Sequence, residues 1–291
     1  MKKFNKFLSV ALASAMVMAM AGCGNTDNGS AATGTNAATE NAAASDSAAS
    51  GSVFKIGGIG PTTGGAAVYG LAVQHGAEIA VKEINDAGGI NGVPIEFQFQ
   101  DDEHDAEKSV NAYNTLKDWG MQVLMGTVTS APCIAVADKT AADNMFQITP
   151  SGSAVECAAN PNVFRVCYSD PAQGTASAKY IGEHKLASKV AVIYDSSDVY
   201  SSGIYEKFAQ EAPNQGIEVV DAEAFTADSN KDFSTQLQKA KESGAELVFL
   251  PIYYTEASLI LQQANTMGFA PQFFGCDGMD GLLQVQNFDV K

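Results

Sequence analysis

The sequence contains few basic residues, few histidines and a single tryptophan, and these shortages exclude several classes of protein. The 17 lysines and arginines are outnumbered by 33 aspartates and glutamates, which gives a formal net charge of -16 at pH 7. Nucleic-acid-binding domains need a basic surface, so the acidic balance argues against that function. With only three histidines and five cysteines, at spacings unlike those of a zinc site, no metal or cofactor is expected.

Motifs of enzymes are also scarce. The sequence has no Gly-x-Ser-x-Gly nucleophile elbow, and no histidine follows a predicted strand beside a serine. Gly58 and Gly60 imitate the start of a dinucleotide-binding fingerprint, but the third glycine comes one residue late and Pro61 interrupts the pattern. We therefore expect a protein that is not an enzyme and binds no nucleotide.

The N-terminal segment has the pattern of an export signal. Three lysines within the first six residues precede an apolar run, 7–21, that is short for a transmembrane helix. The residues before Cys23 resemble a lipobox, so residues 1–22 are predicted to be a signal peptide and Cys23 to be lipidated, the alternative being an ordinary secreted protein. The rest of segment 23–52 is rich in Ala, Ser, Thr, Asn and Gly and is predicted to be a disordered tether.

After the tether, apolar strands alternate with amphipathic helices. Predicted strands cover 53–59, 95–100, 123–125, 145–149, 163–166, 189–194, 217–221, 246–250 and 271–275, and predicted helices cover 66–87, 106–119, 131–142, 170–184, 203–212, 232–244 and 256–267. This alternation occurs twice over, which predicts an α/β fold of two doubly wound parallel-sheet lobes, 53–170 and 171–277. A ligand cleft is expected between the lobes.

The stretch Val123–Ser153 holds the clearest candidate binding site. It reads as a strand, a glycine turn, a helix with Ser130 as N-cap, and a second strand that ends before Ser151. Because the carboxyl ends of parallel strands face the ligand crevice, these hydroxyl residues are expected at one rim of the sheet. Helix N-termini there would suit a small anion such as a carboxylate, although plain capping is the alternative.

Two clusters in the sequence each allow a structural and a functional interpretation. The acidic run 101–105 could be a metal site, but a solvated strand end with Asp105 as the next N-cap is favoured. An exported protein can form disulfides, and Cys157 and Cys167 flank a predicted turn, so they are a possible pair. Cys133, on the helix after Ser130, is predicted to be buried and free.

Taken together, these motifs resemble the substrate-binding proteins of branched-chain amino acid ABC transporters, the leucine/isoleucine/valine-binding group of type I periplasmic-binding proteins. The resemblance covers residues 55–277. It rests on the segments IGGIGPTTGGAAVYG (56–70), AVKEINDAGGINGVPIE (80–96), GTVTSAPC, ITPSGS, FRVCYSDPAQG (164–174) and KDFSTQLQKAKESGAELVFLPIYYTEASLILQQANTMGF (231–269). It implies the type I periplasmic-binding-protein fold, with an interlobe cleft.

The resemblance also implies a function. The chain would be a monomeric, lipid-anchored, extracytoplasmic protein that binds an amino acid, first of all a branched-chain aliphatic one, and delivers it to an ABC permease. A sensory module that signals ligand occupancy to a receptor is an alternative, as is the binding of amides, urea or other amino acids. Members of this group continue well past the equivalent of Lys291, so residues 278–291 match the start of a crossover back to the first lobe and the chain is expected to be C-terminally truncated.

A set of ligand residues follows from the same resemblance. Ser130 matches the hydroxyl that contacts the α-carboxylate, and Asp277 matches the acid that pairs with the α-ammonium, where close relatives often carry glutamate. Two further serines match positions that clasp both charged groups, and three tyrosines match residues that line the pocket. The complete implied set is Tyr69, Ser130, Ser151, Ser153, Tyr200, Tyr253 and Asp277.

Overall fold

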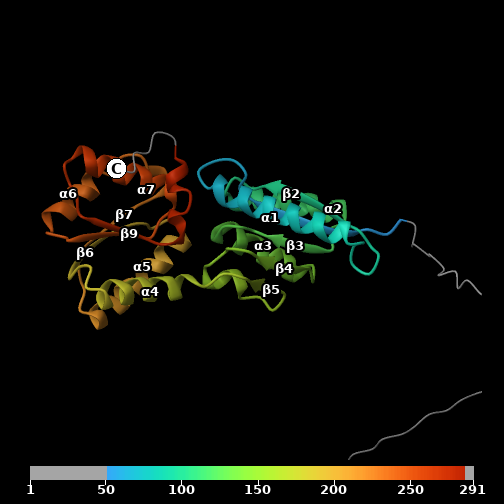
Figure 1. Cartoon of the computed structure of the whole chain (residues 1–291), viewed down its shortest axis with the longest axis horizontal. Coiled ribbons are helices and arrows are strands. Elements are labelled where there is room, and N and C mark those ends of the chain that lie inside the picture. Colours follow the sequence, from blue (N-terminus) through green and yellow to red (C-terminus); the bar gives the residue numbers. More distant parts are fainter. Residues whose placement is uncertain (1–50, 286–291) are drawn as a thin grey trace, which may run out of the picture. The chain divides into compact units, whose positions relative to one another are not determined.

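The computed structural model describes residues 51–285, and the predicted signal peptide, Cys23 and nearly all of the predicted tether lie outside this range. Within it, strands and helices alternate along the chain and build two parallel sheets (Figure 1). The first sheet uses strands between residues 54 and 165, and the second uses strands between residues 189 and 275. No helix in the described part of the chain is long and apolar enough to cross a membrane.

The first lobe contains a five-stranded sheet in the order β2-β1-β3-β4-β5. Its elements are β1 (Phe54–Gly60), α1 (Ala67–Asp86), β2 (Ile95–Asp101), α2 (Ala106–Trp119), β3 (Val123–Gly126), α3 (Ser130–Ala142), β4 (Phe146–Thr149) and β5 (Val163–Arg165). The chain passes from β1 outward to β2 and then back past β1 to β3 and β4. Because crossovers between parallel strands are right-handed, this reversal places α1 on one face of the sheet and α2 and α3 on the other.

The two faces of the first sheet are covered differently. Under α2 and α3 lies an apolar core that includes Ile59, Tyr113, Leu116, Leu124 and Val136. On α1, Leu71, Ile79 and Ile84 each remain more than a third exposed. The one buried residue of α1 is Gly70, where an added β-carbon would lie 1.8 Å from the Pro61 carbonyl oxygen. The close approach of α1 to the loop after β1 therefore depends on glycine at this position.

The second lobe contains a four-stranded parallel sheet in the order β7-β6-β8-β9. Its elements are α4 (Asp170–Glu183), β6 (Lys189–Asp195), α5 (Val199–Glu211), β7 (Glu218–Phe225), α6 (Ser234–Glu242), β8 (Leu247–Leu250), α7 (Tyr254–Thr266) and β9 (Gln272–Gly275). The chain again reverses direction within the sheet, this time between β7 and β8, so helices cover both faces. The prediction of two doubly wound parallel-sheet lobes is confirmed.

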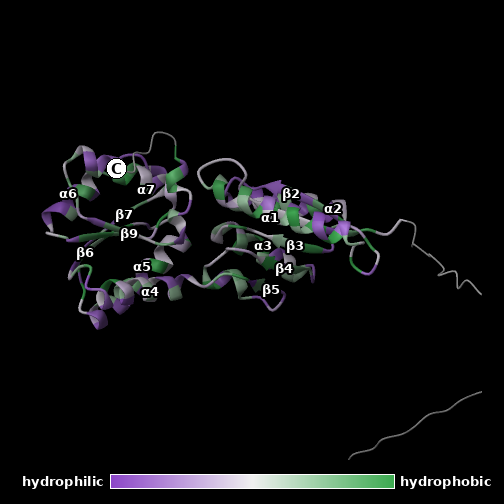
Figure 2. Cartoon of the chain, viewed as in Figure 1, coloured by the Kyte–Doolittle hydropathy of each residue, from purple (hydrophilic) through white to green (hydrophobic). Residues whose placement is uncertain are grey.

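Strand β6 shows why the apolar runs in this lobe are continuous instead of alternating. Val190 and Val192 pack against α4 and α5, whereas Ala191 and Ile193 pack against α6 and α7. All four side chains are fully buried because the sheet has helices on both faces. The outer helix α6 shows the opposite pattern, with mainly hydrophilic residues along its short length (Figure 2).

Strand β7 extends to Phe225, whereas the predicted strand ended at 221, and two helix starts that involve predicted ligand residues also differ from the prediction. Helix α5 begins at Val199, so Tyr200, predicted to lie in a polar loop before a helix at 203, stands in the first turn of that helix. The N-cap of α3 is Thr129, and Ser130 is the first residue of the helix. Both differences lengthen the helix toward its N-terminus and carry a predicted ligand residue into the first helical turn, where backbone N–H groups have no partner within the helix.

Candidate ligand-binding site

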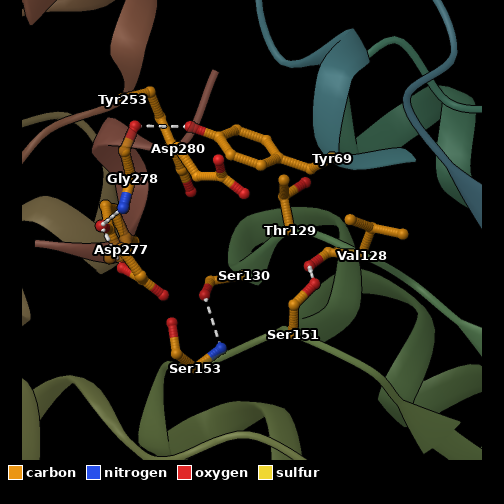
Figure 3. Close-up of a pocket in the computed structure, with 11 residues that line it drawn as sticks. Tyr69, Val128, Thr129, Ser130, Ser151, Ser153, Tyr253, Asp277, Gly278 and Asp280 are labelled. Carbon is orange, nitrogen blue, oxygen red and sulfur yellow. Dashed lines mark hydrogen bonds between the residues drawn. The ribbon is translucent and has the colours of Figure 1, made fainter. Parts of the chain in front are cut away.

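A cavity of about 260 Å³ lies where the two lobes face each other, at the carboxyl ends of the strands (Figure 3). Its lining consists of Tyr69, Val128, Thr129, Ser130, Ser151, Ser153, Tyr200, Tyr253, Asp277, Gly278 and Asp280. All seven residues that the sequence implied as ligand contacts are in this lining. The structure therefore brings together side chains from β1–α1, β3–α3, β4, α5, β8–α7 and the segment after β9.

Ser130 is held by the loop that follows β4. Its hydroxyl oxygen accepts hydrogen bonds from the backbone N–H groups of Ser153 and Ala154, both at 3.1 Å. Two accepted bonds occupy the lone pairs and leave the hydroxyl hydrogen free. Ser130 is thus a donor toward the cavity, and it stands beside the unpaired N–H groups and positive dipole end of α3.

Ser151 has the opposite hydrogen-bonding polarity. Its hydroxyl donates to the Val128 carbonyl oxygen at 2.6 Å, which uses its only hydrogen. Toward the cavity Ser151 can act only as an acceptor. Figure 3 shows this bond and the bond between Ser130 and Ser153 on the first-lobe side of the cavity, where the wall is built by hydroxyl groups of fixed orientation.

On the second-lobe side, Asp277 is oriented by neighbouring side chains. The buried Tyr200 hydroxyl donates to Asp277 Oδ1 at 2.6 Å and accepts from the Gly278 N–H at 2.9 Å. The Asp277 N–H donates to Gln173 Oε1 at 2.9 Å. Burial keeps the pKa of Tyr200 well above its usual value, so the phenol stays protonated and remains a donor to the carboxylate.

The tyrosines join the two lobes across the cavity. Tyr69, from the first lobe, donates its hydroxyl hydrogen to the Gly278 carbonyl oxygen at 2.6 Å. Its ring packs on that of Tyr253, with 5.8 Å between the ring centroids, and Tyr253 in turn stacks on Tyr200 at 4.6 Å. His104 lies edge-on to Tyr253 at 5.2 Å and shares a 2.8 Å hydrogen bond with Thr129. Burial lowers the pKa of His104, which favours its neutral form at this contact.

The charges of the lining are of one sign. Asp277 and Asp280 are acidic, and no lysine, arginine or histidine is in the lining described above. In residues 51–285 no group of three or more histidine, cysteine, aspartate or glutamate side chains is arranged to hold a metal ion. The arrangement offers hydrogen-bond donors from Ser130 and the start of α3 on one side, and a carboxylate from Asp277 on the other. Such a site is complementary to a molecule that carries both a carboxylate and an ammonium group.

The predicted disulfide between Cys157 and Cys167 is wrong. The four cysteines of the described residues are all free thiols. Cys157 lies on a short 3₁₀-helix, Val155–Ala158, and its side chain packs inward against Cys133. There the thiol is fully buried and donates to the Ser130 carbonyl oxygen at 3.6 Å. The prediction that Cys133 is buried and free is confirmed.

The acidic run 101–105 makes local contacts with its own backbone and side-chain neighbours. Asp105 is the N-cap of α2, as predicted, and its carboxylate accepts from the Lys108 N–H at 2.8 Å. Asp101 accepts from the Thr62 N–H and the Thr63 hydroxyl at 2.8 and 2.6 Å. The capping part of the favoured interpretation is confirmed, but the strand end is not solvated throughout, because Asp102 is fully buried.

The ligand set that the resemblance implied lacks four lining residues, although the strand pattern had placed Thr129 beside Ser130 at the rim of the sheet. Thr129 and Val128 precede Ser130 in the same loop, and Gly278 follows Asp277. Their position next to a predicted ligand residue was the sequence signal that could have identified them. Asp280 has a weaker signal, because it is separated from Asp277 by a 3₁₀ turn that the sequence did not predict. Figure 3 shows its carboxylate on the Tyr69 side of the cavity.

Comparisons with known proteins give a consistent result. Residues 53–285 match a family described as periplasmic binding protein. A Leu/Ile/Val-binding protein homologue of Brucella melitensis is 33% identical over 226 residues, which cover 77% of this chain and 61% of the relative. A leucine-, isoleucine-, valine-, threonine- and alanine-binding protein of Pseudomonas aeruginosa is 32% identical, covering 77% of this chain and 60% of the relative.

Solved structures give the same picture. The branched-chain amino acid transporter substrate-binding protein LivJ of Streptococcus pneumoniae, in complex with isoleucine, is similar with a TM-score of 0.72 and 30% identity, covering 77% of this chain and 64% of that one. A leucine-binding protein LivK of Thermotoga maritima has a TM-score of 0.73 and 27% identity, covering 81% and 67%. The chain spans about three fifths of the length of the curated relatives it matches.

Proposed function

The chain belongs to the periplasmic binding protein family, and from this premise we propose that it binds a free amino acid between its lobes and delivers it to the permease of an ABC importer. The family places it outside the cytoplasm. We further propose that Cys23, which lies outside the described residues, carries a lipid anchor and that the protein works as a monomer without catalytic activity. The relatives named for leucine, isoleucine and valine support branched-chain amino acids as the first ligand class.

The observation that carries this proposal is the division of donors and acceptors between the lobes. The Ser130 hydroxyl and the first turn of α3 present donors on one side, and Asp277 presents a carboxylate fixed by Tyr200 on the other. The α-carboxylate and α-ammonium of an amino acid need these two sets. Hydrogen bonds to charged groups contribute about 1.5–3 kcal/mol each, so three or four of them are enough for affinity in the micromolar range, near -8 kcal/mol.

The rest of the lining suits an apolar side chain. Tyr69 and Tyr253 contribute aromatic rings to the lining, Val128 adds a branched aliphatic group, and the hydroxyl of Tyr69 is already engaged with Gly278. An aliphatic side chain placed against these rings would be removed from water, with a gain of about 25 cal/mol per Å² of buried apolar surface. The Tyr69 contact with Gly278 also connects the lobes, so closing motions that bury the ligand would strengthen the same set of contacts.

The experiment that tests the proposal is a thermal-shift screen of the full-length protein against the common amino acids, short amides and urea. We expect leucine, isoleucine and valine to raise the unfolding midpoint, because a ligand that binds only the folded state stabilises it. If an amide or urea raises the midpoint while no α-amino acid does, the proposed ligand class is wrong. Uptake of the bound ligand by vesicles that contain the permease then tests delivery, and its absence with intact binding would contradict the transport role.

A further inference from the structure

Thr129 is the N-cap residue of α3, but its hydroxyl does not cap the helix. A threonine at this position usually accepts a hydrogen bond from a backbone N–H of the first helical turn. Thr129 has the extended backbone of an N-cap, with φ of -106° and ψ of 159°, yet its side chain makes no capping bond. Because the side chain is buried, its hydrogen-bond partner comes from elsewhere in the protein.

The partner of the Thr129 hydroxyl is His104. The Nδ1 atom of His104 lies 2.8 Å from Thr129 Oγ1, which is hydrogen-bonding distance for either tautomer of the imidazole. Whichever group supplies the hydrogen, the bond fixes the direction of the hydroxyl. Figure 3 shows the side chain of Thr129 directed away from Ser130 and toward Tyr69.

The loop between β2 and α2 holds His104 in place for this contact. Glu103 and His104 both have left-handed backbone conformations, with φ of 51° and 62°. The His104 N–H donates to Oδ1 of the fully buried Asp102 at 3.0 Å, and the imidazole packs edge-on against Tyr253 of the second lobe. The imidazole is therefore fixed on two sides and can hold Thr129 in one rotamer.

The diverted hydroxyl leaves the first turn of α3 without a cap. Within residues 51–285, the backbone N–H groups of Ser130 and Ala131 have no hydrogen-bond partner, and Pro132 has no N–H. Ala131 is the second residue of the helix, so its N–H is the group that a capping threonine would occupy. A carboxylate bound at this helix end needs the same group.

We propose that His104 is a positioning residue for the ligand's carboxylate, because it keeps the Thr129 hydroxyl away from the Ala131 N–H and leaves that donor free for the ligand. This inference rests on the proposed function, which brings a carboxylate to the start of α3. Without His104, the Thr129 hydroxyl can rotate into the capping position and compete with the ligand. His104 is not in the cavity lining, so its effect passes through Thr129.

Two substitutions of His104 separate this role from packing, measured by calorimetry of the full-length protein with the amino acid that gives the largest thermal shift. His104→Phe keeps a ring against Tyr253 and removes the hydrogen-bonding nitrogen. It should weaken binding by about fivefold, the contribution typical of an N-cap bond. His104→Asn removes the ring but keeps a group that can hydrogen-bond to Thr129, and asparagine tolerates the left-handed backbone, so it should lose no more than about twofold. The control His75→Phe, on an exposed position of α1, should bind as the wild type does.

The double variant of His104→Phe with Thr129→Val tests whether His104 acts through the hydroxyl. Valine has no hydroxyl to cap the helix, so adding His104→Phe to Thr129→Val should cost less than about twofold. If His104→Phe does not fold, His104→Ala replaces it, alone and together with Thr129→Val, with the same expectations.

The possible outcomes distinguish this inference from the proposed function. A larger loss for His104→Asn than for His104→Phe would show that the ring and not the hydrogen bond matters, and it would overturn the role of His104 while the proposed function stands. Unchanged affinity of His104→Phe, or an equal loss in the Thr129→Val background, would do the same. A wild-type protein that binds no α-amino acid would instead overturn the proposed function, and with it this inference.

Discussion

Replacing Asp277 by asparagine is the most direct perturbation of the ligand site. The substitution keeps the shape of the side chain and an oxygen that can accept from the Tyr200 hydroxyl, now 2.6 Å from Oδ1. The Asp277 N–H bond to Gln173 comes from the backbone and is unaffected. What is removed is the negative charge that would pair with the ligand's ammonium group. The change in affinity therefore reports on that charge, with little rearrangement of the wall.

The magnitude follows from the chemistry of the contact. A hydrogen bond to a charged group contributes about 1.5–3 kcal/mol, and about 1.4 kcal/mol corresponds to a tenfold change in the dissociation constant. Removing this contact is therefore expected to raise the dissociation constant by about 10-fold to 150-fold. Asp277 is exposed to the cavity and is screened by solvent there, which reduces the electrostatic part. We expect a loss at the lower end, at least about tenfold.

The assay is titration calorimetry of the full-length protein with the amino acid that gives the largest thermal shift. Asp228→Asn, an exposed aspartate on a 3₁₀ turn of the same lobe, is the matched control and should bind as the wild type does. Circular dichroism of both variants checks that the fold is retained. An Asp277→Asn variant that is folded and binds with unchanged affinity would refute the reasoning, because the ammonium group would then have its acceptor elsewhere.

Three other substitutions test separate parts of the structure. Tyr200→Phe removes the acceptor of the buried Gly278 N–H, so urea denaturation should show a loss of about 1–3 kcal/mol, and an unchanged free energy of unfolding would contradict it. Burial raises the pKa of Asp102 to about 7, so the folded state disfavours the charged carboxylate and loses stability as the pH rises from about 4 to 7. Asp102→Asn removes this charge and should raise the free energy of unfolding by up to roughly 4 kcal/mol at pH 8. An equal gain in the free energy of unfolding at pH 4 would contradict this explanation. Gly70→Ala places a β-carbon against the Pro61 carbonyl and should lower the melting temperature by the equivalent of about 3 kcal/mol, which a thermal scan measures.

The sequence predicted the fold well because the signal for a buried parallel strand is local. The run around Val190 to Ile193 is apolar at every position, as a strand covered on both faces must be, and the glycines that end helices are equally local signals. The start of α5 was less predictable. Residues 195–202 are mostly polar and rich in serine, a composition typical of loops, but the buried side chains of Tyr200 and Ile204 fix that segment as a helix through tertiary packing.

For the candidate site, the sequence could predict which residues belong to it but not how their hydroxyl groups are oriented. Resemblance to a family identified seven of the eleven lining residues, whereas pattern alone pointed to the hydroxyl groups around α3. The polarity of each hydroxyl required coordinates, since Ser130 and Ser151 are identical in sequence terms and differ in which backbone groups they meet. The disulfide prediction failed for the same reason. Spacing placed Cys157 near Cys167, but the direction of the side chain depends on a short 3₁₀ turn.

The contact between Tyr69 and Gly278 has a consequence for the kinetics of folding. These residues are 209 positions apart, so the cavity wall that they share cannot form until both lobes have folded and met. A ligand therefore has no complete site to bind in a chain that has folded only one lobe. We expect the ligand to slow unfolding and to leave the folding rate of either lobe unchanged, because its contacts are absent from the early transition states. Ligand supply would then set how long each folded molecule survives, and not how quickly new molecules mature.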